Sequence, residues 1–330
     1  MEMMEMVQRF PDQLIEAMQI GEAAQIRPAV EINKIYVTGM GGSGIGADFV
    51  SKFIQGHCRV PYLVSKSYET ASYVDKNTIV IASSYSGNTE ETLANLNSCI
   101  AQGARIICIA SGGKVIQLAM ENGFEYVRLP DHWPSPRACL GFSLVAQLFI
   151  LKKLGFIDDG FEDDLREAID LLKGENQSIK EKAKHLADTL YNKRSIIYAT
   201  DRIEPVAVRF RQQINENAKR LCWHHVIPEM NHNELVGWRE HASNEVVIFL
   251  RNSDDFPRNQ QRIELTKEIV NHYCGTSIEL YSKGNSLICR SLYLVHLTDF
   301  ATVMLALLNQ VDAVEVKVID YLKKALSDLA

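Results

Sequence analysis

The sequence predicts an α/β protein built from two doubly wound domains, each a parallel sheet flanked by helices, with further helices at the carboxyl end. Two observations carry this prediction. Short β-branched runs alternate with helical segments in the first half, and the same alternation returns in the second half after a long helical stretch. Because such alternation is typical of parallel sheets covered on both faces, we expect two domains, at 1–155 and 156–330.

In the first half, each predicted strand is a short apolar run that gives way to small or polar residues. The predicted strands are 35–38, 62–65, 78–82, 105–110 and 124–129. The predicted helices are 45–55, 89–102, 114–121 and the apolar segment 141–154. Helices between strands are what a parallel sheet requires, because parallel neighbours need a crossover connection.

The second half opens with a helical region at 161–190 and then repeats the order of strands and helices. The predicted strands are 195–199, 246–250 and 276–281, and the predicted helices are 205–218, 259–272, 286–309 and 314–329. The segment 198–205 stands where the first half has a glycine-rich loop, and it lacks the glycines. The simplest interpretation is a duplicated fold in which only the first copy keeps phosphate-binding loops.

Composition limits the possible partners of the chain. The 330 residues are 46% hydrophobic and 23% charged, a balance that is ordinary for a globular protein. With 35 basic and 41 acidic residues and no long basic run, the sequence lacks the footprint of a nucleic-acid-binding protein. A small molecule is therefore the expected partner.

The cysteines and the amino-terminal segment indicate a cytoplasmic protein. The seven cysteines form no CxxC or similar pair, so we expect reduced, structural thiols. The amino-terminal segment is acidic and lacks the apolar stretch of a signal peptide. The apolar stretch 292–310 contains His296, Thr298 and Asp299, and a buried helix explains it better than a membrane span.

A glycine-rich segment, 38–46, follows the first predicted strand and opens a helix. Gly39, Gly41 and Gly44 satisfy the G-x-G-x-x-G spacing of dinucleotide-binding folds. Such a site also needs an acidic residue at the end of the second strand to hold the ribose, and Lys66 and Ser67 stand there instead. This difference disfavours NAD, whereas NADP remains open.

A second loop, 83–89, ends the third predicted strand with the sequence SSYSGNT. The hydroxyls of Ser84, Ser86 and Thr89, together with Ser43 of the first loop, can surround one tetrahedral anion at the start of a helix. A dinucleotide fold has no use for this arrangement, so the loop predicts a phosphate site. The alternative is a plain helix cap, since Ser and Thr favour such positions.

Together these motifs resemble a known family. GMGGSGIG (39–46) and SSYSGNTEETL (83–93) look like the sugar isomerase (SIS) domain. PRACLGFSL (136–144), INENAK (214–219) and NHNELVGW (231–238) look like the bifunctional phosphoglucose/phosphomannose isomerases, along essentially the whole chain. The resemblance implies two SIS domains, a homodimer with shared active sites, no cofactor and no metal. It also implies interconversion of glucose 6-phosphate or mannose 6-phosphate with fructose 6-phosphate.

The resemblance assigns roles to individual residues. Glu216 matches the family's catalytic base, and Arg137 matches the arginine that faces the enediolate. His232 matches the ring-opening histidine, which in the family looks to come from the partner subunit. Lys323 matches a carboxyl-terminal lysine that contacts substrate, with two nearby lysines as competitors. The residues expected to bind the substrate phosphate are Gly42, Ser43, Ser84, Ser86 and Thr89.

These residue types suit aldose–ketose isomerisation. The reaction needs an acid/base for ring opening, a carboxylate that moves a proton between C2 and C1, and a cation for the enediolate. An imidazole both gives and takes protons near neutral pH, and a guanidinium stabilises oxyanion charge without exchanging protons. Glucose and mannose phosphates share one enediolate, and Thr298 is a candidate for a small residue that leaves room for both epimers.

Other interpretations stay open at this point. The segment HHVIPEMNH (224–232) suggests metal ligands, but it fits no ligand spacing and we expect a surface loop there. A sugar-phosphate sensor without turnover and an NADP-dependent reductase are rival functions. The alternative interpretation of Glu216 is an ordinary solvated residue of a helix. The alternative interpretation of Arg137 is an arginine that pairs with an acidic residue at the start of a helix. Trp133, Cys139 and Cys222 have no role that the sequence can assign.

Overall fold

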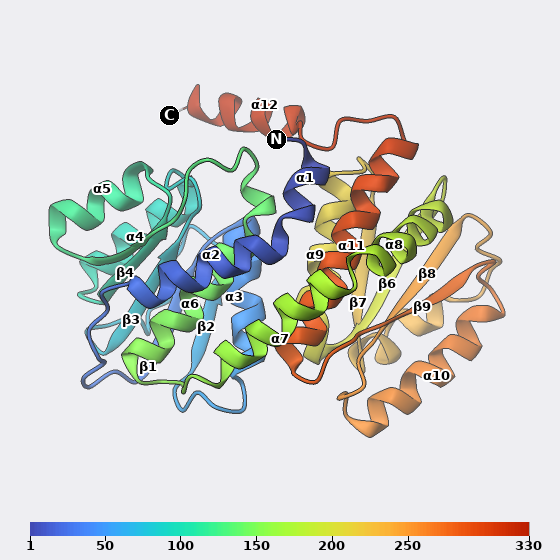
Figure 1. Cartoon of the computed structure of the whole chain (residues 1–330), viewed down its shortest axis with the longest axis horizontal. Helices are drawn as coiled ribbons and strands as arrows, with labels where there is room; N and C mark the ends of the chain where they lie inside the picture. Colours follow the sequence, from blue (N-terminus) through green and yellow to red (C-terminus); the bar gives the residue numbers. More distant parts are fainter. Residues whose placement is uncertain (330) are drawn as a thin grey trace. The chain divides into compact units, whose positions relative to one another are not determined.

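The computed structural model describes residues 1–329 and divides them into two compact units (Figure 1). The first unit consists mainly of residues 6–174 and 283–293, and the second mainly of 175–282 and the chain from 294 onward. The domain limits expected from the sequence, 1–155 and 156–330, stay a prediction. The short helix α1 (Met3–Gln8) and the long helix α11 (Leu287–Leu308) contribute residues to both units.

The first unit contains a five-stranded parallel sheet with the order β2-β1-β3-β4-β5. Its strands are β1 (Lys34–Thr38), β2 (Tyr62–Ser65), β3 (Thr78–Ser83), β4 (Arg105–Ala110) and β5 (Glu125–Arg128). Its helices are α2 (Phe10–Ala23), α3 (Gly41–Ile54), α4 (Glu90–Ala101), α5 (Gly113–Asn122), α6 (Leu140–Leu154), α7 (Gly160–Gly174) and the 3₁₀ turn η1 (Pro136–Ala138).

The three central strands β1, β3 and β4 are buried along nearly their whole length, and since successive side chains of a strand point to opposite faces, the sheet is covered on both sides there. Tyr36, Val80 and Cys108 belong to a core that includes residues of α4 and α5. The opposite face is covered by α3, which also packs against α6, and Figure 1 shows α2 running alongside α6. Continuous apolar strands are what a sheet covered on both sides requires.

The strand order creates a switch point between β1 and β3. From β1 the chain crosses to β2 on one side, and from β3 it crosses to β4 on the other. Open parallel sheets bind ligands at such a point, beyond the carboxyl ends of the strands. Both predicted phosphate loops leave the sheet there.

The second unit contains a four-stranded parallel sheet with the order β7-β6-β8-β9. Its strands are β6 (Arg194–Thr200), β7 (Cys222–Ile227), β8 (Glu245–Arg251) and β9 (Ser277–Tyr281). Its helices are α8 (Asn176–Leu190), α9 (Glu204–Glu216), α10 (Pro257–Asn271), α12 (Lys317–Ser327) and the 3₁₀ turns η2 (Asp201–Ile203), η3 (Glu229–His232) and η4 (Glu234–Gly237). The order of its strands repeats that of β2-β1-β3-β4, so the predicted fold class is confirmed.

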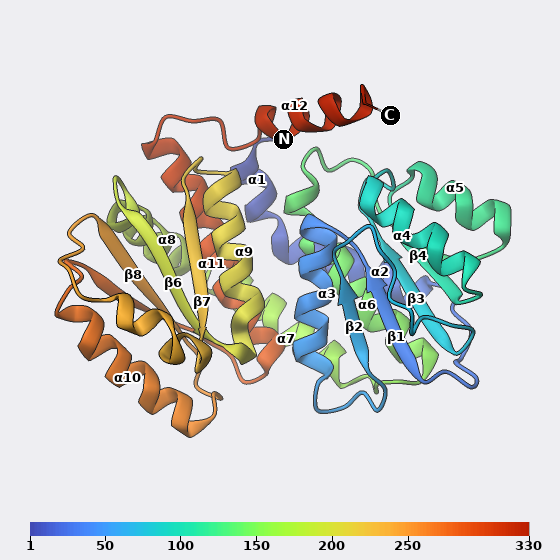
Figure 2. The same ribbon diagram turned by 180° about the vertical axis from the view of Figure 1, so that it is seen from behind.

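The structure differs from the sequence-based prediction in three places. Residues 224–227, part of the loop expected at 224–232, belong instead to the edge strand β7 (Cys222–Ile227), which pairs in parallel with β6. The helical region predicted at 161–190 is two helices, α7 and α8, that meet at Gly174. The helices α1 and α2 were not predicted at all. From behind, Figure 2 shows α9 lying beside β7.

Helix α11 is the apolar segment that the sequence placed inside the protein. It is the one helix among residues 1–329 that is long and apolar enough to cross a membrane, and 83% of its most apolar window is buried in the protein. Asp299 on this helix makes a bidentate ion pair with Arg209 of α9, at 2.6 and 3.1 Å, and both side chains are buried. A paired charge inside the protein suits a core helix, so the prediction of a buried helix is confirmed.

Candidate active site

The first loop turns tightly between β1 and α3. A Cβ atom on Gly39 would lie 2.7 Å from the carbonyl oxygen of Ser83, closer than side chains are tolerated. Glycine at this position therefore lets β1 and β3 end side by side. Ser43, in the first turn of α3, accepts a hydrogen bond from the backbone N–H of Tyr85 across 3.2 Å. This contact joins the first loop to the second.

The second loop places two hydroxyls together. The Ser84 and Thr89 hydroxyls lie 2.9 Å apart, and Ser86 Oγ accepts the N–H of Asn88 across 3.3 Å. Thr89 precedes α4 without making a side-chain cap bond to that helix. Thr89 nevertheless occupies the N-cap position of α4, so the choice between a plain helix cap and a phosphate site stays a prediction. At Gly87 φ is +69°, and a Cβ there would lie 1.9 Å from the Gly112 carbonyl oxygen, so only glycine allows this turn.

Arg137 lies next to the first loop within the same unit. It is half-buried in η1, and a Cβ atom on Gly42 would lie 3.2 Å from the Pro136 carbonyl oxygen and 3.6 Å from Arg137 Cα. The unit thus brings together the backbone of Gly42, the hydroxyl loops and the segment of the predicted enediolate arginine. The orientation in which Arg137 would meet a sugar stays a prediction.

Two residues without a role in the sequence support this arginine segment. Trp133 is buried, packs edge-on against Phe142 at 5.9 Å between ring centroids, and lies under the guanidinium of Arg9 at 5.1 Å. The thiol of Cys139 donates to the Ser135 carbonyl across 3.5 Å. Both side chains anchor the ends of the loop that carries Arg137.

At the end of the second strand, where an NAD site would need an acidic residue, the structure has an ion pair. Lys66, at the end of β2, pairs with Asp48 on α3. Burial raises the pKa of Asp48, and the neighbouring Lys66 acts against that rise. No acidic residue follows β2 directly, and the Asp48 carboxylate at this end of the sheet is engaged by Lys66.

The equivalent switch point of the second sheet is filled by a side chain of the protein itself. Beyond β6 and β8, Thr200 Oγ1 and Asn252 Nδ2 each lie 2.8 Å from the same carboxylate oxygen of Asp255, which is buried. Burial raises the pKa of Asp255, and the bonds to Asn252 and Thr200 act against that rise, so a buried acid group stands where the first sheet has the glycines of the proposed phosphate site. The second unit therefore has no counterpart of the phosphate loops.

Glu216 is the last residue of α9 and is half-buried. Its backbone carbonyl accepts a hydrogen bond from Lys219 Nζ across 2.5 Å. It belongs to the second unit, as do His232 and Lys323, whereas Arg137 and the two loops belong to the first. That these groups meet around one substrate stays a prediction.

His232 ends the turn η3 and is exposed. The segment around it is tied down by a network that the sequence analysis missed. Glu234 accepts a hydrogen bond from Tyr198 across 2.5 Å, and its other oxygen lies 2.8 Å from His225 Nδ1. The indole N–H of Trp238 donates to Tyr198 across 3.1 Å. The glutamate and the tryptophan of the motif NHNELVGW were the only sign of this network in the sequence. Their shared partner, Tyr198, lies 36 and 40 residues earlier in the chain, so no local pattern connects them.

The two adjacent histidines do not form a metal centre with their neighbours. Both histidines lie on strand β7, so the loop predicted here is wrong. Their side chains point to opposite faces of the sheet, because successive side chains of a strand alternate. Burial, reinforced by the cation of Arg211, lowers the pKa of His224 to about 4. Within residues 1–329, no group of three or more His, Cys, Asp or Glu side chains is arranged to hold a metal ion.

The remaining predicted contacts are Lys323 and Thr298. Lys323 is exposed on α12, a helix with no buried residue, and apolar side chains such as Val318 and Tyr321 are exposed beside it. Thr298 is fully buried and donates to the carbonyl of Leu294 within α11. That Thr298 leaves room beside the sugar stays a prediction.

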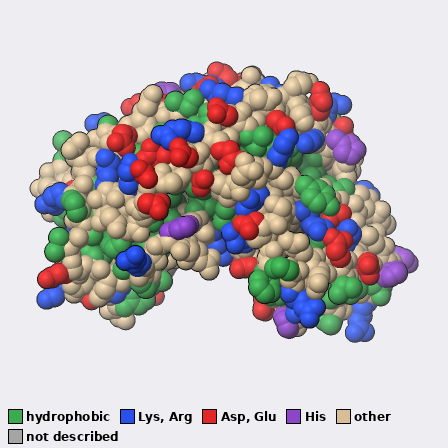
Figure 3. Space-filling view, turned by 60° about the horizontal axis from the view of Figure 1, so that its bottom comes forward, with side chains coloured by type: hydrophobic (Ala, Val, Ile, Leu, Met, Phe, Trp, Pro, Cys, Tyr) green, Lys and Arg blue, Asp and Glu red, His purple; other side chains and the backbone are tan. Residues whose placement is uncertain are grey.

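Charged side chains show no concentration of one sign on the face drawn in Figure 3, where basic and acidic groups are interspersed. This pattern agrees with the near balance of 35 basic and 41 acidic residues. It gives no support to a polyanionic partner such as nucleic acid.

Comparison with known proteins assigns the chain to a family. Residues 30–125 match the SIS domain, and residues 179–326 match the bacterial phospho-glucose isomerase C-terminal SIS domain. A bifunctional phosphoglucose/phosphomannose isomerase from Caldicellulosiruptor bescii is 38% identical over 99% of each chain. A D-glucosamine-6-phosphate 4-epimerase from Sulfolobus acidocaldarius is 32% identical over 67% of this chain and 69% of its own.

Solved structures show the same fold at low sequence identity. The C-terminal domain of glucosamine-fructose-6-phosphate aminotransferase from Francisella tularensis superposes with a TM-score of 0.75 at 14% identity, covering 95% of this chain and 98% of its own. This likeness is one of architecture, whereas the sequence identity to the isomerase from C. bescii extends from end to end. The chain belongs to the bifunctional phosphoglucose/phosphomannose isomerase family.

Proposed function

We propose that this protein is an aldose–ketose isomerase that interconverts glucose 6-phosphate and mannose 6-phosphate with fructose 6-phosphate. The observation that supports it most is the cluster at the switch point of the first sheet, where Ser43 meets the loop of Ser84 and Thr89. Hydroxyls and helix-start N–H groups suit a phosphate monoester. The name of the full-length relative supports hexose phosphates as the substrates.

In this proposal the two loops hold the phosphate, which leaves carbons C1 and C2 at the free end of the sugar. Glu216 carries the proton between C2 and C1, and Arg137 stabilises the negative charge of the enediolate. His232 transfers the proton that opens the ring, and Lys323 contacts the substrate from α12. Removal of the C2 proton erases the difference between the two aldoses, so one site serves both.

We also propose a homodimer in which His232 serves the site of the partner subunit. What supports this is an exposed histidine on a segment that is well anchored, together with exposed apolar side chains on α12. An exposed apolar helix face suits an association surface. The cytoplasm is the proposed compartment, supported by seven cysteines that are all free thiols.

Glu216→Gln tests the isomerase against a sugar-phosphate sensor. Turnover of each aldose phosphate, followed by a coupled assay, should fall by roughly 10² or more because the proton carrier is lost. Binding of fructose 6-phosphate, measured by calorimetry, should stay within about threefold. Glu268→Gln, at an exposed glutamate of α10, is the matched control. A sensor would bind the phosphosugar and show no turnover even as wild type.

Glucosamine 6-phosphate belongs in the same assay, because the relative from S. acidocaldarius is named as its 4-epimerase. An epimerase would change the configuration at C4 without forming a ketose. Product analysis by NMR separates the two reactions. If the wild type epimerised this amino sugar and left both hexose phosphates unchanged, the isomerase proposal would be wrong.

Mixed dimers test the sharing of active sites. Glu216→Gln and His232→Asn chains are each expected to be inactive alone. If His232 acts in the partner's site, half of the sites in a mixed dimer keep both residues, and a random mixture recovers roughly a quarter of wild-type activity. If each subunit uses its own histidine, every site carries one substitution and mixing recovers nothing.

A further inference from the structure

Helix α9 ends inside the motif INENAK (214–219), which contains Glu216. The side-chain amide of Asn215 donates to the Arg220 carbonyl across 2.7 Å. Asn217 is fully buried and donates to Thr302 of α11 across 3.0 Å. The last turn of α9, with Glu216, is therefore held both by its own loop and by α11.

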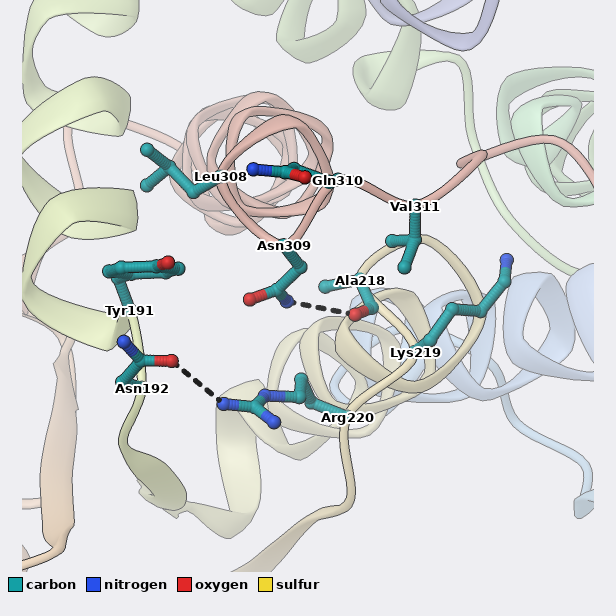
Figure 4. Close-up of a pocket in the computed structure, with 9 residues that line it drawn as sticks. All are labelled: Tyr191, Asn192, Ala218, Lys219, Arg220, Leu308, Asn309, Gln310 and Val311. Atoms are coloured by element: carbon teal, nitrogen blue, oxygen red, sulfur yellow. Dashed lines mark hydrogen bonds between the residues drawn. The ribbon is translucent and has the colours of Figure 1, made fainter.

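Three helices end in the second unit around the pocket drawn in Figure 4, which has a volume of about 260 Å³. α8, α9 and α11 are followed there by Asn192, Lys219 and Gln310, whose φ angles are +58°, +57° and +56°. Glycine or asparagine usually takes this left-handed position after a helix. A lysine in it is strained, and such strain persists only where the surroundings enforce it.

From this position the amine of Lys219 makes two hydrogen bonds to backbone carbonyls. Nζ donates to the carbonyl of Glu216 across 2.5 Å and to the carbonyl of Glu315 across 2.8 Å. It also lies 3.7 Å from the Glu315 carboxylate. A cation is favourable at the carboxyl end of a helix. In Figure 4 the Lys219 side chain points away from Arg220, while Asn309 donates to the Ala218 carbonyl across 2.9 Å.

Glu315, which contacts Lys219, also contacts the first residue of α12. Its carboxylate accepts the backbone N–H of Lys317, the first residue of α12, across 3.0 Å. Its own N–H and that of Val314 point to the carboxylate of Asp312, at 3.4 and 2.7 Å. A defined turn therefore connects Lys219 to the helix that carries Lys323.

We propose that Lys219 and Glu315 form a latch that holds the end of α9 and the start of α12 in one arrangement. The latch makes both residues positioning residues for the proton transfer by Glu216, and this inference rests on the proposed isomerase function. In this proposal Lys219 acts through its contacts with α9 and α12, and not by contact with the sugar. Its side chain fixes where Glu216 stands relative to α12.

Substitutions at Lys219 separate the amine from the backbone strain. Lys219→Met removes the amine and keeps the strained position, whereas Lys219→Gly removes the amine and relieves the strain. Both should lower kcat roughly 10- to 100-fold, with KM changed less than about threefold, because the proton carrier loses its position. Amide hydrogen exchange across 311–327 should accelerate by at least about tenfold. Lys219→Arg should recover most of the activity, and Arg220→Ala on the same loop is the control.

Melting temperature checks that each variant is folded. Wild-type kcat in Lys219→Met, or full recovery in Lys219→Gly, would overturn the latch, because the amine would then be dispensable. Faster exchange with unchanged kcat would show that the contact holds α12 without positioning Glu216, which also overturns the inference. If the wild-type protein isomerises nothing, the proposed function fails, and the exchange measurement still decides whether the contact between Lys219 and Glu315 holds α12.

Discussion

Nδ1 of His225 lies 2.8 Å from the carboxylate of Glu234, so the segment that carries His232 is fastened to strand β7. The second oxygen of the same carboxylate accepts the hydroxyl of Tyr198 on β6. Burial raises the pKa of Tyr198, and the adjacent Glu234 adds to that rise. The phenol thus stays protonated and acts as a donor. One glutamate thus fastens the segment of the exposed His232 to two strands of the sheet.

Glu234→Gln should lower kcat about tenfold with little change in KM, because the amide weakens two charge-assisted hydrogen bonds and loosens the segment of His232. Steady-state kinetics with both aldose phosphates would measure the change. Tyr198→Phe should have a smaller effect, and the double variant should be less than additive because both act through one network. Glu240→Gln, at an exposed position, is the control. Strict additivity would contradict a shared network.

Ser43→Ala and Thr89→Ala should each raise KM by roughly tenfold and leave kcat nearly unchanged. Each removes a hydroxyl from the phosphate site, and a hydrogen bond to a charged group contributes about 1.5–3 kcal/mol. Kinetics and calorimetric binding of inorganic phosphate would check this. Ser98→Ala, at an exposed serine farther along α4, should behave like wild type. A fall in kcat at constant KM would place these hydroxyls at the reacting carbons instead.

Asp299→Asn should destabilise the protein by about 3 kcal/mol, because it leaves the buried guanidinium of Arg209 without its countercharge. The two side chains are only 4% and 6% exposed, so water cannot compensate. Urea unfolding would measure the loss. The matched control is Asp188→Asn, whose carboxylate is 51% exposed and pairs with Lys184, and it should change stability by less than about 0.5 kcal/mol. Equal effects would mean that the buried pair contributes nothing special.

Stability should fall as the pH drops below about 6.5, in part through His296. Burial lowers the pKa of His296 from 6.5 to about 3, so between these values the unfolded chain binds a proton that the folded chain does not. Unfolding then becomes more favourable as pH falls, by about 2 kcal/mol between pH 6.5 and 5. His296→Phe, which can keep the ring contact with Phe300, should lose less stability over the same window. Urea unfolding midpoints of the wild type and of His296→Phe at several pH values would measure this difference. The same pH dependence in both proteins would contradict the role given to His296.

Much of the fold could be read from periodicity. The strand ending at Ser83 is a continuous apolar run, as both-sided burial requires, and it was predicted to within one residue. Strand β7 was missed because it lies at the sheet edge, where the exposed Trp223 and the half-buried His225 carry no apolar pattern. The break between α7 and α8 was not predicted, because both helices have strong amphipathic patterns and Gly174 is the one helix-breaking residue between them.

The amino-acid order alone determined the alternation of strands and helices, the two glycine- and serine-containing loops and the family, because these depend on local spacing along the chain. Only the tertiary structure decided that Ser43 bonds to the second loop, that Asp255 closes the matching point of the other sheet, and that Lys219 reaches Glu315. These contacts join residues 42, 55 and 96 positions apart. Partners at such separations leave no local pattern, because only the folded chain brings them within reach of one another.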